Sequence, residues 1–99
     1  MHPLQSLRAF VTVAREGSVS RAAERIHLTQ PAVSLKLKQR QEELDLQLFQ
    51  RKPQGLVLTP DGQALLPSAE KALAAMAAFD QNARAMHSTV RGRLRIGTI

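Results

Sequence analysis

Apolar residues at helical spacing predict a first helix near the start of the chain. They lie three or four residues apart, separated by polar residues, at Leu4, Leu7, Phe10, Val11 and Ala14. Gly17 follows this stripe where a left-handed C-terminal cap is expected, because glycine adopts a positive φ without steric cost. The first helix is therefore expected to end just before Gly17.

A second, shorter helix is expected soon after this glycine. Ser20 is a suitable N-cap for a helix over residues 21–26, because its side-chain oxygen can accept a hydrogen bond from a free backbone N–H. The adjacent Ala22 and Ala23 have small side chains. A neighbouring helix can therefore approach closely at this point.

A third helix is predicted after a tight turn made by His27 and Leu28. Thr29 is its expected N-cap, and Pro31 falls in the first turn, where a missing N–H does no harm. The apolar pattern continues to about Leu44. On a helical wheel the predicted buried stripe contains Val33, Leu37 and Leu44.

The pattern shortens after residue 47, which predicts a β-hairpin followed by a long helix. Residues 48–51 and 56–58 are the expected strands, around a turn at 52–55 with a basic tip. Thr59, Pro60 and Asp61 then form a strong helix start signal, and the helical pattern continues to about residue 86. Pro67 is expected to bend this helix rather than break it.

The fourth predicted helix carries an apolar seam with alternating spacings of four and three, which is typical of helix pairing. The seam contains Leu65, Ala69, Ala72, Met76, Phe79, Ala83 and Met86, and Leu66 and Leu73 widen it. Such a stripe favours a helical partner. Residues 91–93 are interpreted as a linker and residues 94–97 begin to alternate like a strand, so another domain is expected to start where the chain stops.

Composition favours a folded, basic protein. The chain has 99 residues, with 14 Lys and Arg against 8 Asp and Glu, which gives a formal net charge of +6. This excess favours a polyanion partner, either nucleic acid or an anionic membrane surface. There is no cysteine, and neither a signal peptide nor a membrane span is recognised, so we expect a cytoplasmic location.

Several short motifs then point to a known family. In chain order they are Leu7-Arg8-Ala9-Phe10, Gly17-Ser18, Ala22-Ala23-Glu24-Arg25, Thr29-Gln30-Pro31-Ala32-Val33-Ser34, Leu48-Phe49-Gln50-Arg51 and Leu58-Thr59-Pro60-Asp61-Gly62. Each one alone is weak evidence. In this order and at these intervals, they resemble the N-terminal region of the LysR-type transcriptional regulators over nearly the whole chain.

The resemblance implies a mainly α fold, a winged helix-turn-helix of three helices and a two-stranded β-hairpin wing, followed by a long dimerisation helix. We expect residues 1–58 to form the DNA-binding domain, 59–87 the linker helix, and 88–99 a hinge and the start of an effector-binding domain. The third helix would enter the major groove of operator DNA, and the wing would reach the flanking backbone or minor groove.

The predicted contacts combine this resemblance with the outward face of the third helix. Residues expected at the DNA are Ser20, Arg21, Thr29, Gln30, Pro31, Ala32, Ser34, Leu35, Lys38, Arg51, Lys52 and Gln54. Residues expected at the dimer interface are Leu65, Ala69, Ala72, Leu73, Met76, Phe79 and Ala83. Polar residues at a helix start can also be simple caps and solvated side chains, which is the alternative at Thr29, Gln30 and Ser34.

Four residues depart from the usual family pattern. Leu35 replaces a frequent arginine, and we expect an apolar contact there, such as one with a thymine methyl group, or no contact at all. Gln54 also stands where many relatives have arginine, which predicts a weaker grip by the wing. Arg40 falls in the buried stripe, so its stem is expected to pack while its charged head reaches solvent. Asp45 replaces a common glycine and is expected to tolerate a left-handed conformation.

Other functions are less consistent with the sequence. The histidines His2, His27 and His87 are scattered and no glycine-rich phosphate loop follows a strand, so no catalytic, metal or cofactor site is expected. The alternative is a helical membrane-surface or protein-interaction module, but the fourth helix lacks a basic flank. The resemblance implies a homodimer, a tetramer at full length, and a small-molecule co-inducer bound by an absent C-terminal domain. RNA polymerase is a further candidate partner.

Overall fold

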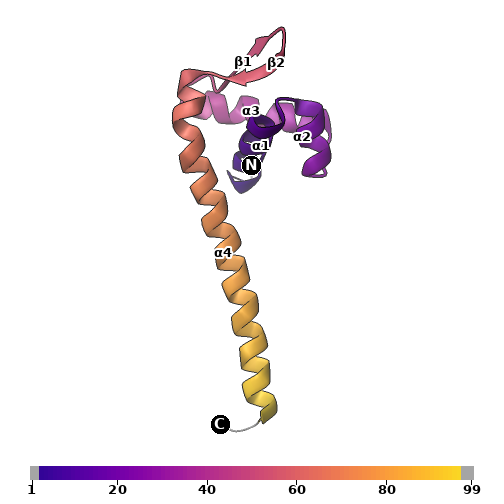
Figure 1. Ribbon diagram of the computed structural model, residues 1–99, viewed down its shortest axis with the longest axis vertical. Helices are drawn as coiled ribbons and strands as arrows, with labels where there is room; N and C mark the ends of the chain where they lie inside the picture. Colours follow the sequence, from indigo (N-terminus) through magenta and orange to yellow (C-terminus); the bar gives the residue numbers. More distant parts are fainter. Residues whose placement is uncertain (1–2, 97–99) are drawn as a thin grey trace.

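The computed structural model describes the backbone of residues 3–96 and the side chains of residues 4–87. Its elements in chain order are α1 (Pro3–Glu16), α2 (Val19–Arg25), α3 (Gln30–Leu44), β1 (Phe49–Lys52), β2 (Gly55–Leu58) and α4 (Pro60–Ile96). The molecule measures 63 × 25 × 24 Å, because α4 extends far beyond a small body made by the other elements (Figure 1). The predicted fold class is confirmed.

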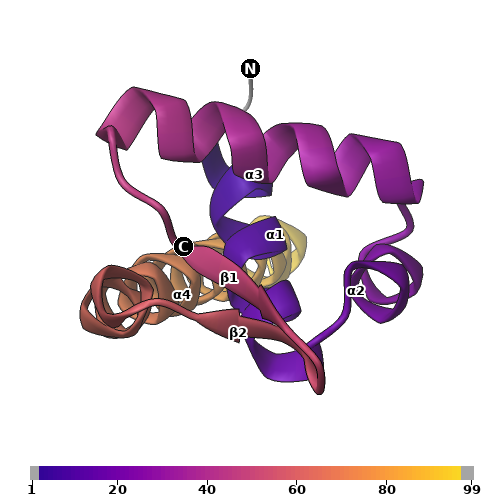
Figure 2. The same cartoon turned by 90° about the horizontal axis from the view of Figure 1, so that it is seen from above.

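Helix α1 forms the centre of the body. Its residues Ala9, Phe10, Val11 and Val13 are buried, and the helix contacts α2, α3, α4 and β2. Viewed along α4, α1 lies in the middle, with α3 on one side and the hairpin on the other (Figure 2). Gly17 ends α1 with a φ of 68°, and its N–H donates to the Val13 carbonyl over 2.8 Å, as the sequence predicts.

Helix α2 begins two residues earlier than predicted. Ser18 is its N-cap and accepts a hydrogen bond from the Arg21 N–H at 3.3 Å, whereas Ser20 lies exposed inside the helix. The prediction of Ser20 as the cap was wrong because the left-handed Gly17 already turns the chain, and this leaves Ser18 extended. Ala22 and Ala23 are buried, which confirms the close approach expected there.

Helix α3 starts where the sequence predicts. His27 turns the chain with a φ of 57°, and Thr29 caps α3 by accepting from the Ala32 N–H at 3.2 Å. At the other end Asp45 adopts the left-handed conformation expected of it, with φ 57° and ψ 42°. The path of the chain into and out of α3 is therefore fixed by local turn chemistry.

The buried side of α3 differs from the prediction at two positions. Val33 and Leu37 are buried, but Leu44 is 41% exposed because it lies in the last turn, at the rim of an apolar hollow between α1, α3 and α4. The head of Arg40 does not escape to solvent. It donates to the buried Ser6 hydroxyl, over 3.1 Å from Nε, and lies 3.5 Å from Glu43 Oε1. These partners offset the desolvation of the guanidinium.

Strands β1 and β2 form an antiparallel hairpin in which Phe49 pairs with Leu58 and Lys52 with Gly55. The observed strands differ by about one residue from the predicted ones, since Leu48 is buried in the core just before β1. Thr59 then caps α4 and accepts from the Gly62 N–H at 3.0 Å.

Helix α4 runs without a break through Pro67 to Ile96, ten residues beyond the predicted end. The expected strand-like start at 94–96 was wrong, because these residues continue α4. No proline follows Pro67 in the sequence, and a single glycine in the helix weakens it only modestly. Residue 97 lies outside the described residues. Only the first part of α4 packs on the body, where Ala69 is buried and Leu65 and Leu73 are partly buried.

Candidate nucleic-acid interface

One groove of about 420 Å³ joins the start of α2, the first turns of α3 and the hairpin. Its lining residues are Gly17, Ser18, Val19, Ser20, Gln30, Ser34, Arg51, Gly55 and Leu56. Four predicted DNA-contact residues from three elements therefore meet here: Ser20, Gln30, Ser34 and Arg51. The groove is narrow at one end, where a side-chain Cβ placed on Gly55 would lie 3.2 Å from the Gly17 carbonyl oxygen.

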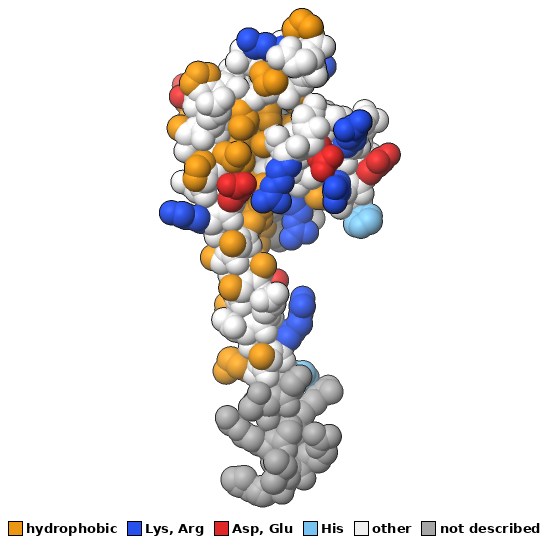
Figure 3. Space-filling view, in the orientation of Figure 1, with side chains coloured by type: hydrophobic (Ala, Val, Ile, Leu, Met, Phe, Trp, Pro, Cys, Tyr) orange, Lys and Arg blue, Asp and Glu red, His pale blue; other side chains and the backbone are white. Residues whose placement is uncertain are grey.

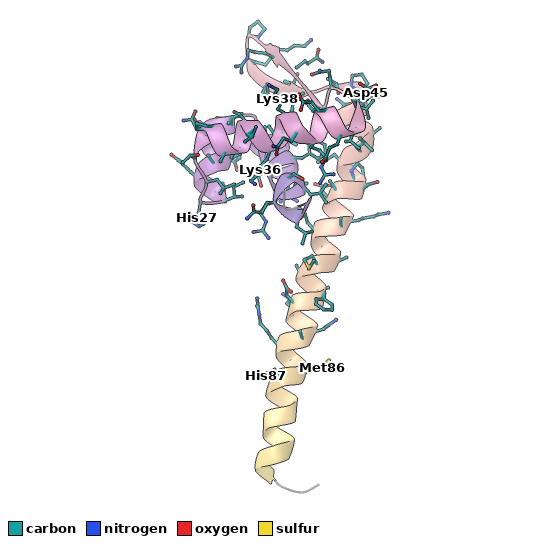
Figure 4. All side chains as sticks on the ribbon, turned by 180° about the vertical axis from the view of Figure 1, so that it is seen from behind. His27, Lys36, Lys38, Asp45, Met86 and His87 are labelled. Carbon is teal, nitrogen blue, oxygen red and sulfur yellow. The ribbon has the colours of Figure 1, made fainter. Side chains whose placement is uncertain are left out.

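The outward face of α3 matches the predicted face. Pro31, Ser34, Leu35 and Lys38 are exposed, and Leu35 has 53% of its surface open to solvent. Ala32 is half-buried behind them. In Figure 4, Lys36 and Lys38 lie on opposite edges of α3. About half of the Leu35 surface is therefore available to an external partner.

The start of α3 is electrostatically suited to an anion. The first backbone N–H groups of a helix lack intrahelical partners, and the helix dipole places partial positive charge there. The Thr29 hydroxyl already accepts from the Ala32 N–H, so its oxygen is committed to capping. Gln30 is the first residue of α3 and is exposed, with its side chain in the groove. The helix terminus and this amide therefore share one location.

The hairpin presents its predicted contact residues on two different faces. Successive side chains of a strand point to opposite sides. Arg51 lines the groove with α3, whereas Lys52 and Gln54 line a second hollow beside the end of α1, together with Arg15. The structure thus brings Arg51 to α3 and places Lys52 and Gln54 in a different hollow.

The cations around the groove are not neutralised by the protein. Three ion pairs of the described residues join Arg15 to Glu70, Arg25 to Glu16 and Arg40 to Glu43. Within residues 4–87, no carboxylate lies within ion-pair distance of the four predicted cations at the DNA: Arg21, Lys38, Arg51 and Lys52. All four are exposed. Their charge is therefore open to an external anion.

The predicted dimerisation seam divides into two parts. Leu65, Ala69 and Leu73 pack against the chain's own body, and Met76 is half-buried beside α1. The remaining seam residues are exposed: Ala72, Phe79, Ala83 and Met86. Phe79 and Met86 each have 67% of their surface open, and Figure 3 shows hydrophobic side chains along α4 below the body.

Sequence reasoning missed two residues of this region. Ser18 caps α2 and lines the groove, and the run Ser18-Val19-Ser20 contains the signal, because either serine could cap a helix. Gln41 is the second. Its side chain bonds two backbone N–H groups at the start of the hairpin, and no local motif in the sequence indicates this contact.

Two other kinds of site are absent from the part of the chain that the structure describes. No group of three or more His, Cys, Asp or Glu residues lies close enough to hold a metal ion. No helix there is both long enough and apolar enough to cross a bilayer.

Two helices joined by a tight turn, with a basic hairpin beside the second of them, define a winged helix-turn-helix. Comparison with known proteins identifies the family. Residues 4–63 match the model for bacterial regulatory helix-turn-helix proteins of the lysR family. The chain belongs to this family.

Individual relatives support the assignment. The chain is 41% identical, over 96% of its length, to an uncharacterized HTH-type transcriptional regulator in the ibpB-leuC intergenic region of Azotobacter vinelandii, covering 66% of that protein. It is 41% identical over 97% of its length to the HTH-type transcriptional regulator CfxR of Cupriavidus necator, covering 30% of it. Our chain therefore spans less than two thirds of either relative.

A solved structure extends the likeness to the fold. The crystal structure of the BenM_DBD/catB site 1 DNA complex is similar with a TM-score of 0.81 and 30% sequence identity. The match covers 88% of our chain and 98% of that chain. The similar fold includes the arrangement of helices and hairpin described above.

Proposed function

We propose that this chain is the DNA-binding region of a transcription regulator and that it reads operator DNA with α3 in the major groove. The observation that carries the proposal is the groove in which Gln30, Ser34 and Arg51 meet, with the exposed cations Arg21 on α2 and Lys38 on α3. The similar BenM_DBD fold, solved as a complex with DNA, supports it. The membrane-surface or protein-interaction alternative is not favoured, because both relatives described above are named as transcriptional regulators.

Sequence reading rests on three side chains of α3 in this proposal. The Gln30 amide can pair with the donor and acceptor edge of an adenine, and the Ser34 hydroxyl can donate or accept. Leu35 supplies an apolar surface that fits a thymine methyl group. All three are exposed on the outward face of α3. Pro31 and Ala32 lie beside them and shape the contact surface.

In this proposal, contacts with the DNA phosphates provide the affinity for DNA. The start of α3, capped by Thr29, faces one phosphate, and Ser20 and Arg21 on α2 with Lys38 on α3 contact the backbone around it. Arg51 approaches DNA from the groove side of the hairpin. Lys52 and Gln54 contact the flanking backbone from the other face, where Gln54 lacks the charge to hold a phosphate strongly.

We further propose that two copies pair through α4. The exposed Phe79 and Met86 leave apolar surface that a second copy would cover. The apolar hollow of about 280 Å³ between α1, α3 and α4, which Leu65 and Leu44 border, offers additional surface at the base of α4. Ala72 and Ala83 have small side chains that allow two helices to approach. Two recognition helices about one DNA turn apart, or a small multiple, would follow.

The remaining partners belong to the full-length regulator. The proposal includes a C-terminal domain that binds a small-molecule co-inducer, tetramer assembly and contact with RNA polymerase, all in the cytoplasm. None of these requires a cofactor or an enzymatic reaction in residues 1–99. The chain itself supplies the reading of DNA and one dimer contact.

Selection from random duplex DNA with this 99-residue chain tests the proposal. We expect an enriched site with two-fold symmetry, bound with an affinity that falls steeply with salt because phosphate contacts release counterions. The measured slope of log K against log salt gives the number of phosphate contacts. Recovery of unrelated sequences, with equal affinity for all of them, would overturn the proposal.

A further inference from the structure

Gln41 holds the segment that leads from α3 to the hairpin. Its backbone carbonyl accepts from the Leu46 N–H at 3.1 Å. Its side-chain Oε1 accepts from the Leu48 N–H at 2.7 Å and from the Phe49 N–H at 3.3 Å. One half-buried residue of α3 therefore binds three backbone N–H groups of the connection into β1.

The same segment is bonded on its other side to the start of α4. The Leu48 carbonyl accepts from the Thr59 N–H at 3.0 Å, and the Thr59 hydroxyl donates to the Gln47 carbonyl. Leu48 and Phe49 are buried, and the Phe49 ring packs edge-on against Phe10 with centroids 5.6 Å apart. Apolar packing fixes where β1 begins, and the hydrogen bonds fix the direction in which it leaves the core.

The side-chain contact has no substitute in the hairpin. The Leu48 carbonyl bonds Thr59, but the Leu48 N–H turns to Gln41 instead of β2. Without that acceptor, an N–H at a buried residue would lie unpaired, which is costly enough to favour a different orientation of the peptide. Rotation of this peptide would swing β1, and with it Arg51, relative to α3.

We propose that Gln41 is a positioning residue that couples the recognition helix to the wing. It sets the separation between the base-reading side chains of α3 and the phosphate contact of Arg51 across the groove. This inference rests on the proposed DNA-binding function. Gln41 itself touches no DNA, because its side chain is turned toward the hairpin backbone.

The test compares Gln41→Met with Gln41→Glu, each with and without Arg51→Ala, on the DNA site selected by the wild-type chain. Methionine keeps the length of the side chain but removes the acceptor, whereas glutamate keeps an acceptor for both N–H groups. In the wild type and in Gln41→Glu, we expect Arg51→Ala to weaken binding about fivefold and to lower the salt slope by about 1. In Gln41→Met, the same Arg51→Ala change is expected to have no effect.

The base preference at positions read by α3 should be the same in wild type and Gln41→Met, because Gln30 and Ser34 are not displaced. A merely structural role would lower the melting temperature of Gln41→Met but would leave the effect of Arg51→Ala intact. Glutamate adds negative charge near DNA, so the criterion is the effect of Arg51→Ala within each background, as in a double-mutant cycle.

The inference is overturned if Arg51→Ala costs the same in Gln41→Met as in the wild type, or if it costs nothing in the wild type. If Gln41→Met does not fold, Gln41→Asn gives the same comparison, because an amide one methylene shorter cannot reach both N–H groups. Failure of the proposed function gives a different result, namely a wild-type chain that selects no DNA site.

Discussion

The body and α4 differ in how much of their apolar surface the chain itself buries. In the body, Ser18 caps α2, Thr29 caps α3, and Val33, Leu48 and Phe10 are enclosed by the chain itself. Along α4 beyond Met76, the apolar side chains Phe79 and Met86 stay 67% exposed. The body thus encloses its apolar core within the chain itself, whereas the described part of α4 beyond Met76 leaves apolar side chains open to solvent.

The largest effect expected from this contrast is on assembly. Phe79→Ser should weaken the proposed dimer by about 4 kcal/mol, or about 1000-fold in Kd, because the change occurs in both copies. The body should keep its melting behaviour. Analytical ultracentrifugation over a range of concentrations measures the dimer. Ala74→Ser, at an exposed position about 140° around α4 from Phe79, is the control and should leave the dimer intact; a wild-type monomer at all concentrations would contradict the proposal.

The next largest effect is expected on the free energy of unfolding, at the junction between the body and α4. A Cβ on Gly62 would lie 2.2 Å from the Leu48 carbonyl oxygen and 3.1 Å from its carbon, so either the start of α4 or the core must move. Gly62→Ala is expected to lower the free energy of unfolding by about 3 kcal/mol despite alanine's better helix propensity.

Urea denaturation followed by circular dichroism measures this loss. Gln63→Ala is the matched control, because Gln63 is the exposed neighbour in the same helical turn. If Gly62→Ala were as stable as the control, α4 would not meet the body as closely as described.

Within the body, we expect base preference and overall DNA affinity to depend on different residues. Gln30→Ala is expected to relax base preference at one position by about 2 kcal/mol, because its amide would no longer pair with a base edge. Lys52→Ala should instead weaken specific and nonspecific binding alike, and lower the salt slope by about 1. Parallel selections and salt titrations of the two variants make the comparison. Equal loss of base discrimination in both would refute the assigned roles.

The smallest expected effect distinguishes two neighbouring serines. Ser18→Ala should lower stability by about 1 kcal/mol, because the Arg21 N–H loses its acceptor at the start of α2. Ser20→Ala should change stability by less than about 0.5 kcal/mol, because Ser20 is exposed inside the helix. Thermal melts of both variants in the absence of DNA measure the difference. The reverse order would restore Ser20 as the cap.

Local signals allowed most of the body to be predicted. Gly17, Thr29, Asp45 and Thr59 each fix a turn or a cap through their own backbone or side-chain chemistry, and all four behave as expected. Where two adjacent signals compete, as at Ser18 and Ser20, the choice depends on the conformation of the preceding glycine. Residue types alone offer both serines as caps and do not rank them.

Contacts between distant parts of the chain were not predictable in this way. Arg40 and Ser6 are 34 positions apart, and the buried hydroxyl that receives the guanidinium is visible only once α1 and α3 are packed together. The division of the hairpin into a face with Arg51 and a face with Lys52 likewise depends on how the strands lie against α3. The outward face of α3, in contrast, followed from helical periodicity alone.

The close approach at Gly62 has a mechanical consequence. Helix α4 has 37 residues, which at 1.5 Å per residue makes an arm about 55 Å long. A change of about 5° in its angle at the Gly62 contact would displace the far end by about 5 Å, given that length. The close contact between Gly62 and the Leu48 carbonyl thus limits how far α4 can tilt against the body, and a small change there is amplified along the length of the helix.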